Sequence, residues 1–372
     1  MNVLIMIIKY SKCISKIILQ RSDPLHRQRE VRYKGGLMSI SLKQAYDLFI
    51  FDRATYCKQK TIQNYKNTLS YFFKFLEGDR GCPISEIMLD SVTTMDLKKY
   101  VAFLRSRNKL ESHPLKPTVN QPITKRSIRT YSVDLRTFFH FLYYEEYIST
   151  DITKGFKIIK SETKLVLPLF DGEVKKIDNC FNQKTYTGLR NYCIVHLMLD
   201  EGLRSGDVVN LTTRSINFDE SYIIVLNGKG DKDRIVPLAK RLRQPLYRYL
   251  TFYRPRTSEH DSLFCSLHNP EEPFTLDAIK SLFSRIRKET ELSRLKPHLL
   301  RHTFATSFIL GGGDLESLRL YLGHSSYDTT QNYLHLANTY ERMGSDVYKL
   351  DGIFFRSYYS RGYAIGTNQR VK

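Results

Sequence analysis

The spacing of apolar residues changes from a helical to a strand period in one stretch of this chain, residues 216–238. Residues 216–218 and 222–226, joined by the turn residues 219–221, predict a hairpin, and residues 234–238 predict a third strand after a second turn. This is the one segment whose strand periodicity is convincing. The sequence therefore predicts a mainly α fold with a small antiparallel β-sheet.

Two segments in the first half repeat one apolar pattern, residues 61–76 and residues 127–142. Each places Ile, Tyr, Leu, Phe-Phe and Leu along a single helical stripe. A further helix is expected near residues 94–105. Because two copies are too few for a solenoid, the pattern predicts a compact helical bundle from residue 41 to about residue 148.

The net charge of +20 over 372 residues implies a polyanionic partner, and both nucleic acid and an anionic membrane surface fit that charge. No apolar run reaches the roughly 18 residues that a membrane span needs, and the first residues lack the basic leader of a signal peptide. The six cysteines form no CxxC pair and no metal-binding spacing. These features predict a cytoplasmic protein with reduced thiols and no membrane segment.

Basic residues on the polar faces of the predicted bundle have few acidic neighbours, especially in residues 125–136. A face that is merely solvated would alternate basic and acidic side chains, so the composition favours contacts with phosphates. The basic residues are Lys58, Lys60, Lys66, Lys74, Lys98, Lys99, Arg105, Arg107, Lys125, Arg126, Arg129 and Arg136.

Chemically active side chains are densest between residues 297 and 333. Pro297 suits the first turn of a helix that the glycines at 311–313 end, and His298 and Arg301 share one face of that turn. Asp314 can cap a second helix, for which Gly323 is a suitable left-handed end.

His324 follows this end on the turn, and a third short helix, capped by Ser326 or Asp328, presents Tyr333. The order of helix, turn and helix therefore predicts that two histidines, one arginine and one tyrosine meet in a single pocket.

This combination resembles the carboxy-terminal half of the tyrosine recombinases, the phage-integrase and Xer-type family. Their signature combines HxxRH, here residues 298–302, LGH, here residues 322–324, and a nucleophilic tyrosine about nine residues later, here Tyr333. The resemblance implies a helical core-binding domain ahead of an α+β catalytic domain.

The same resemblance assigns two upstream residues to the site. Arg204, in a GLR context, matches the first arginine of the family, and the acid three residues later is Asp207 where Glu is commoner. Lys229 in the second turn of the β segment matches the family's hairpin lysine, and Lys232 is a second candidate. The GKG triplet lacks the spacing of a phosphate-binding P-loop.

The six candidate catalytic residues would divide the work of phosphodiester cleavage. Tyr333 attacks the phosphate and becomes a phosphotyrosine, while Arg204 and Arg301 grip the phosphate oxygens. His298 accepts the phenolic proton or bonds the phosphate, His324 donates a hydrogen bond, and Lys229 protonates the leaving 5′ oxygen. The cationic side chains fill the role of a metal, so no metal, cofactor or ATP is expected.

The chain order predicts five segments. Residues 1–37 are an extension that is either not translated, with the start at Met38, or a basic arm that touches DNA. Residues 38–153 form the DNA-binding bundle, 154–170 a linker ending before a cap at Asp171, 171–350 the catalytic domain, with helix continuing after Tyr333, and 351–372 a loosely ordered tail.

A site-specific recombinase or integrase is the first hypothesis for the function. It implies double-stranded DNA with paired inverted repeats, a dimer on each site, a tetramer in the synapse, and candidate accessory DNA-bending proteins. A phage, a transposon, an integron or a chromosome dimer could be its substrate. A type IB topoisomerase, which uses the same residues on one duplex, and a non-catalytic DNA-binding protein of the same fold are the alternatives.

Overall fold

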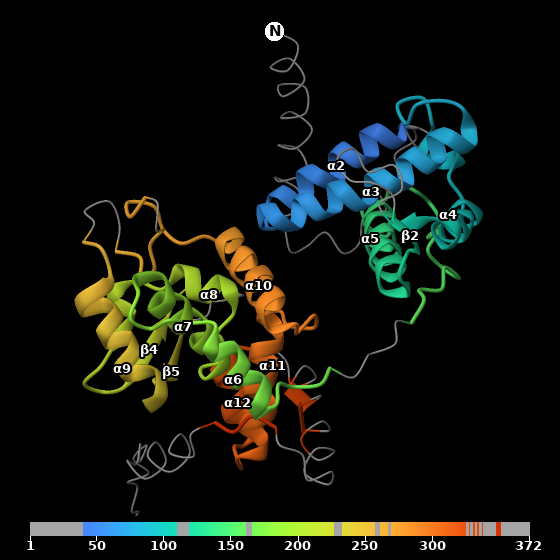
Figure 1. Cartoon of the computed structure of the whole chain (residues 1–372). Helices are drawn as coiled ribbons and strands as arrows, with labels where there is room; N and C mark the ends of the chain where they lie inside the picture. Colours follow the sequence, from blue (N-terminus) through green and yellow to red (C-terminus); the bar gives the residue numbers. More distant parts are fainter. Residues whose placement is uncertain are drawn as a thin grey trace, which may run out of the picture. The chain divides into compact units, whose positions relative to one another are not determined.

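The computed structural model describes residues 40–109, 119–160, 166–226, 233–256, 261–266 and 269–324, and also residues 327, 330, 331, 333, 334, 337 and 347–350. The chain forms two compact units that divide between residues 164 and 165. Figure 1 shows the helices and strands of both units, coloured along the sequence.

The first unit is a helical bundle around an aromatic core. Its helices are α2 (Leu42–Ala54), α3 (Gln59–Arg80), α4 (Thr94–Ser106) and α5 (Lys125–Tyr144), with a short 3₁₀ turn η2 (Leu89–Ser91). The helices predicted at residues 61–76, 94–105 and 127–142 lie within α3, α4 and α5. Phe49, Phe72 and Phe138 are fully buried and meet their neighbours edge to face, which is the favoured geometry for aromatic rings.

A second small sheet in this unit was not predicted. Strands β1 (Asn108–Lys109) and β2 (Val119–Pro122) pair antiparallel with an irregular register. Residues 216–238, the one segment with a convincing strand period, are therefore not the only β structure in the described part of the chain. The two strands are too short to display a period, and every residue of β2 is exposed, so no alternation of apolar and polar residues marks them.

The second unit contains the other helices and a three-stranded sheet. Helix α7 (Tyr186–Leu199), buried along nearly its whole length, packs against α11 (Pro297–Leu310) and α9 (Lys240–Arg248), as expected of a helix that is apolar on all sides. In order, the elements are α6 (Asp171–Asn179), α7 (Tyr186–Leu199), α8 (Ser205–Asn210), η3 (Thr213–Ser215), β3 (Ile216–Asn217), β4 (Tyr222–Val225), β5 (Arg234–Pro237), α9 (Lys240–Arg248), the π-helical turn η4 (Tyr249–Tyr253), α10 (Leu276–Thr290), α11 (Pro297–Leu310) and α12 (Leu315–Leu322).

The predicted β segment is confirmed. Its strands pair antiparallel in the order β3-β4-β5, with Ile223 opposite both Ile216 and Val236. These three side chains are buried, which fixes the register because a slip by one residue would turn them to the other face. The mainly α fold with small antiparallel sheets is likewise confirmed.

The start of α6 differs from the prediction by one residue. Asp171 is the first residue of the helix, and Phe170 occupies the N-cap position. The Glu173 carboxylate accepts a hydrogen bond from the Phe170 backbone N–H, which is the bond that the N3 residue of a capping box makes to the N-cap.

The helix expected after Tyr333 does not extend to residue 350. Val347 forms an antiparallel bridge with Phe170, and the Tyr348 N–H donates to the Leu169 carbonyl at 3.0 Å. Val347, Tyr348 and Leu350 are buried in the second unit. The backbone of this extended segment therefore forms its hydrogen bonds with residues 169 and 170 and not within a helix. Residues 338–346, the 1–37 extension and the 351–372 tail lie outside the described residues.

No helix in the described part of the chain is long and apolar enough to cross a bilayer. The cysteines there are unpaired thiols, at positions 57, 82, 180, 193 and 265.

Candidate active site

Five of the six predicted site residues lie in the described part of the second unit. Arg204 occupies the N-cap of α8, His298 and Arg301 lie in the first two turns of α11, His324 follows α12, and Tyr333 is helical. The sixth, Lys229, and its alternative Lys232 lie outside the described residues, as do the predicted caps Ser326 and Asp328.

Arg301 is the most deeply buried member of this group, with 1% of its surface exposed. Its two terminal nitrogens donate to the carbonyls of Gly202 and Leu322, both at 2.6 Å, and Nη2 also lies 3.1 Å from Nε2 of His324. Burial lowers the pKa of Arg301 to about 9, with repulsion from Arg204 and Arg234 adding to it. The guanidinium is still charged at pH 7.

The turn between α7 and α8 places Arg204 beside Arg301. Gly202 has φ +64°, and a Cβ at this position would lie 2.4 Å from Cδ1 of Phe304. Any larger residue would collide with this buried ring, so the close packing of α7 and α11 depends on the glycine. Gly202 also supplies the carbonyl that binds Arg301.

One terminal nitrogen of the Arg204 guanidinium is hydrogen-bonded within the described part of the chain and the other is not. Nη2 donates to the Gly323 carbonyl at 3.3 Å, whereas Nη1 is buried without a hydrogen-bond partner among the described atoms. A buried donor of this kind normally finds an acceptor, so the site is built to receive one.

Asp207 acts on the Arg204 guanidinium through its charge, which opposes the lowering of the Arg204 pKa by burial, and its hydrogen bonds go to other groups. Its Oδ2 accepts from the backbone N–H of Arg204 at 3.0 Å and from Nη2 of Arg234 at 2.5 Å. The acid therefore holds the start of α8 and the first residue of β5 together.

His324 is neutral at pH 7 in this structure. Burial lowers its pKa to about 4, and the charges of Arg301 and Arg204 lower it further. Because an arginine can only donate, Nε2 of His324 is the acceptor of the Arg301 contact. The proton then resides on Nδ1, which lies 3.0 Å from Oγ1 of the buried Thr330.

Tyr333 lies in the same pocket and is 6% exposed. Its ring meets His302 edge to face at 5.1 Å between centroids and lies nearly parallel to His324 at 6.5 Å. Burial raises the pKa of Tyr333, while Arg301 and Arg204 act in the opposite direction. The two arginines therefore favour the phenolate that a nucleophile requires.

The structure gives two residues a role that sequence reasoning missed. Thr330 orients His324, and His302, quoted only as part of HxxRH, packs against the Tyr333 ring. Burial lowers the pKa of His302 to about 4, with repulsion from His298 as the next cause. The position of His302 next to Arg301 was visible in the sequence, whereas nothing there singled out Thr330.

The two units match two family descriptions. Residues 171–339 match the Phage integrase family, and residues 42–158 match the Phage integrase SAM-like domain. Tyrosine recombinase XerD of Listeria innocua is 29% identical over 292 residues, which is 78% of this chain and 91% of that protein.

Two solved structures share the fold. The Tn1549 transposon integrase in complex with a circular intermediate DNA is 20% identical, with a TM-score of 0.59 over 79% of this chain and 95% of that one. A lambda integrase dimer bound to a COC′ core site is 19% identical, with a TM-score of 0.59 and the same coverage.

A helical first unit and a second unit that places Arg204 and the buried Arg301 near a tyrosine define a class of DNA strand-exchange enzyme. The chain belongs to the phage integrase family of tyrosine recombinases. Its activity is that of a site-specific DNA recombinase, as predicted from residues 298–333. The comparisons do not favour the topoisomerase or the non-catalytic binder.

Proposed function

We propose that Tyr333 cleaves DNA by attacking the scissile phosphate and forming a 3′-phosphotyrosine. The observation that carries this proposal is the buried, unengaged Nη1 of Arg204 in the pocket that holds Arg301 and Tyr333. An anionic oxygen is the ligand that such a donor lacks, and a phosphodiester supplies it.

Arg204 and Arg301 would bind the non-bridging oxygens, whose negative charge grows as the phenol attacks. Both guanidiniums come from rigid elements, and Arg301 is held by two backbone carbonyls. Little reorganisation is needed when the phosphate enters, which is the condition for effective electrostatic catalysis.

The remaining roles are those that the family resemblance implies. His298 accepts the phenolic proton or bonds the phosphate, and Lys229 protonates the departing 5′ oxygen. His324 would have to gain a proton on Nε2 to donate to the phosphate, and the phosphate's negative charge favours that change. The phosphotyrosine keeps the energy of the cleaved bond, so rejoining to a second strand needs no ATP.

Covalent trapping tests the nucleophile. A nicked duplex carrying the enzyme's own site should yield a covalent adduct with the wild-type chain and none with Tyr333→Phe. Tyr327→Phe is the matched control, because it removes an exposed hydroxyl from the same segment. An adduct that survives Tyr333→Phe and disappears with Tyr327→Phe would refute the assignment.

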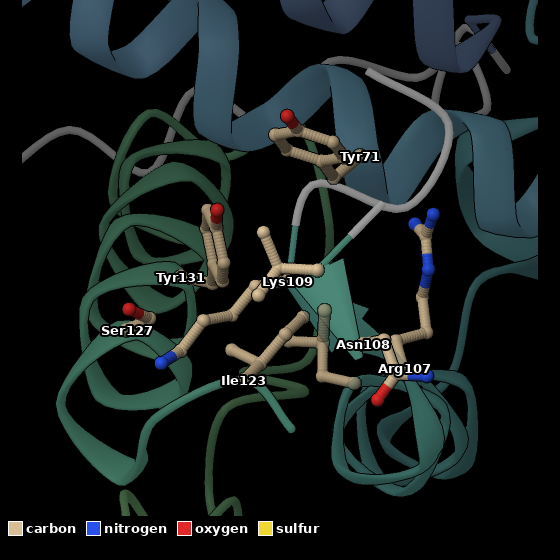
Figure 2. A pocket seen from close by; sticks show the side chains of 9 residues that line it. Tyr71, Arg107, Asn108, Lys109, Ile123, Ser127 and Tyr131 are labelled. Atoms are coloured by element: carbon tan, nitrogen blue, oxygen red, sulfur yellow. The ribbon is translucent and has the colours of Figure 1, made fainter. Parts of the chain in front are cut away.

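The DNA-contacting surface of the first unit is proposed to surround the groove between α3 and α5. Figure 2 shows Tyr71, Lys109, Ser127 and Tyr131 around a pocket of about 290 Å³ beside the β1–β2 hairpin. The adjoining groove is lined by amides and hydroxyls, which are the groups that read base edges, while the exposed basic residues supply phosphate contacts. These lining residues include Asn64, Asn67, Thr68 and Thr130.

Residues 38–153 are accordingly proposed as the DNA-binding domain and residues 171–350 as the catalytic domain, joined by the 154–170 linker. A dimer on paired inverted repeats and a tetramer in the synapse are proposed because exchange between two duplexes requires four cut strands. The DNA complexes of the transposon and lambda integrases support DNA as the partner. We also propose that accessory DNA-bending proteins assist the reaction and that the protein acts in the cytoplasm.

A further inference from the structure

The carboxy-terminal end of α12, just before His324, is bound by three arginines from three different elements. Such an end exposes carbonyl groups that carry partial negative charge and have no partner inside the helix. Three consecutive carbonyls are occupied here. Tyr321 O accepts from Nε of Arg234 at 2.8 Å, Leu322 O from Nη2 of Arg301 at 2.6 Å, and Gly323 O from Nη2 of Arg204 at 3.3 Å.

Arg234 differs from the other two arginines in having a carboxylate partner. Its Nη2 donates to Oδ2 of Asp207 at 2.5 Å, and both side chains are nearly buried, at 8% and 6% exposure. Its Cδ also packs against Gly323, where an added Cβ would lie 3.3 Å away. The Arg234 guanidinium therefore binds α12 through Nε and binds α8, through Asp207, with Nη2.

The hydrogen bonds of Arg204 and Arg301 are electrostatically weaker than the Arg234–Asp207 ion pair. Their partners are neutral carbonyls and a neutral imidazole, so a phosphate oxygen with formal charge offers each of them a stronger hydrogen bond. Arg234 would gain less from a phosphate oxygen, because the Asp207 carboxylate already compensates its charge. Arg234 is thus the one of the three arginines whose hold on the end of α12 is not shared with the phosphate.

We propose that Arg234 is a positioning residue for DNA cleavage: together with Asp207 it holds the end of α12, and with it His324, while Arg204 and Arg301 bind the phosphate. This inference rests on the phosphate-binding role proposed above. It also explains why Asp suffices at position 207. The acid acts on Arg234 and on the backbone of Arg204, and neither task requires the longer reach of Glu.

The first test compares Arg234→Gln and Arg234→Lys with wild type in single-turnover formation of the covalent adduct at saturating DNA. Lysine keeps the charge but cannot donate to Tyr321 and Asp207 with the geometry of a guanidinium. Both variants should cleave about 10- to 100-fold more slowly, the usual cost of removing a residue that orients a ligand group. DNA affinity should stay within about twofold, because the loss falls on the chemical step.

Arg243→Gln is the matched control, since it removes an exposed arginine that also donates to a backbone carbonyl, that of Phe218 at 3.0 Å. It should cleave at the wild-type rate. Equal losses in Arg243→Gln and Arg234→Gln would overturn the inference.

A modified substrate separates positioning from a general weakening of the fold. A methylphosphonate at the scissile position removes one charged oxygen, so the grip of Arg204 and Arg301 matters less for this substrate. The ratio of wild-type to Arg234→Gln rates should fall below about threefold. An unchanged ratio would assign Arg234 a purely structural role, and so would a fall in melting temperature with a parallel loss of DNA binding.

The Asp207→Asn variant completes the test as a double-mutant cycle. Because Arg234 and Asp207 act as one unit, the double variant should be no slower than the slower single variant. Additive losses would contradict the pairing. Failure of the proposed function is distinguishable, because the wild-type chain itself would then form no Tyr333-dependent adduct on either substrate.

Discussion

The two units of this protein bury different kinds of side chain. In the first unit the core is apolar and rich in aromatic rings, and Asp96 is the one charged residue among its buried described positions. The core of the second unit is apolar as well, but it also buries several ionised or ionisable groups. These are Arg190, His196, Asp200, Glu201, Asp207 and Arg301.

The difference reflects what each unit has to hold in place. An aromatic core stabilises helices whose outer faces do the binding, and its contribution scales with the apolar area removed from water. Buried charges cost desolvation energy and stabilise little, so the presence of Arg301 beside Tyr333 is explained by chemistry. The second unit accepts that cost because a phosphate must meet cations in a low-dielectric pocket.

Removing one buried phenyl ring from each unit should give the largest effects. Phe72→Ala in the first unit and Phe304→Ala in the second should each lower the free energy of unfolding by about 3–5 kcal/mol, measured by chemical denaturation of the full chain. Only Phe304→Ala should also slow adduct formation at saturating DNA, because its ring packs against Gly202, whose carbonyl binds Arg301.

The control for both is Phe51→Ala, which truncates an exposed ring and should leave stability nearly unchanged. If Phe72→Ala slowed the chemical step as much as Phe304→Ala, the division between a supporting and a catalytic core would be wrong.

A buried charge in the second unit should have the next largest effect. His196 lies between two carboxylates, with Nδ1 2.6 Å from Asp200 and Nε2 2.8 Å from Asp178. His196→Gln removes the imidazolium from between these acids and keeps one hydrogen bond, while Arg241 remains paired with Asp178, so the free energy of unfolding should fall by about 1–3 kcal/mol.

The pH dependence of this loss follows from the sign of the shift. Burial alone would lower the pKa of His196, but the two carboxylates outweigh it and raise that pKa. The contribution is complete below the unfolded pKa, near 6.5, and disappears as the pH rises through the folded value. Denaturation curves of wild type and His196→Gln should therefore converge with rising pH above about 6.5. A constant gap would contradict the ionised pair.

The smallest effect should come from a single basic residue on the surface of the first unit. Arg129→Ala on α5 should reduce the slope of log affinity against log salt concentration by about 1, without changing sequence preference. Lys43→Ala on α2 is the control, because Lys43 is paired with Asp47. Filter binding at several salt concentrations measures both slopes, and equal slopes for Arg129→Ala and wild type would remove Arg129 from the DNA contact.

Most helices could be read from the sequence because their signals are local. The apolar stripe of α3 and α5, Pro297 at the start of α11, Asp314 as the cap of α12 and Gly323 at its end all appear where they were predicted. The β1–β2 hairpin escaped because its strands are short and exposed. The extended segment around Val347 escaped because its partner, Phe170, lies 177 positions earlier in the chain.

By itself, the sequence determined the helical periods, the caps and the presence of arginine, histidine and tyrosine at family spacing, since each depends on a few neighbouring residues. Tertiary structure decided which partner each charged group has. Asp207 stands three residues after Arg204, yet its side chain binds that of Arg234 across 27 positions, and three arginines converge on the end of α12. Such pairings depend on how α8, β5, α11 and α12 pack, because hydrogen bonds act over about 3 Å in space whatever the distance along the chain.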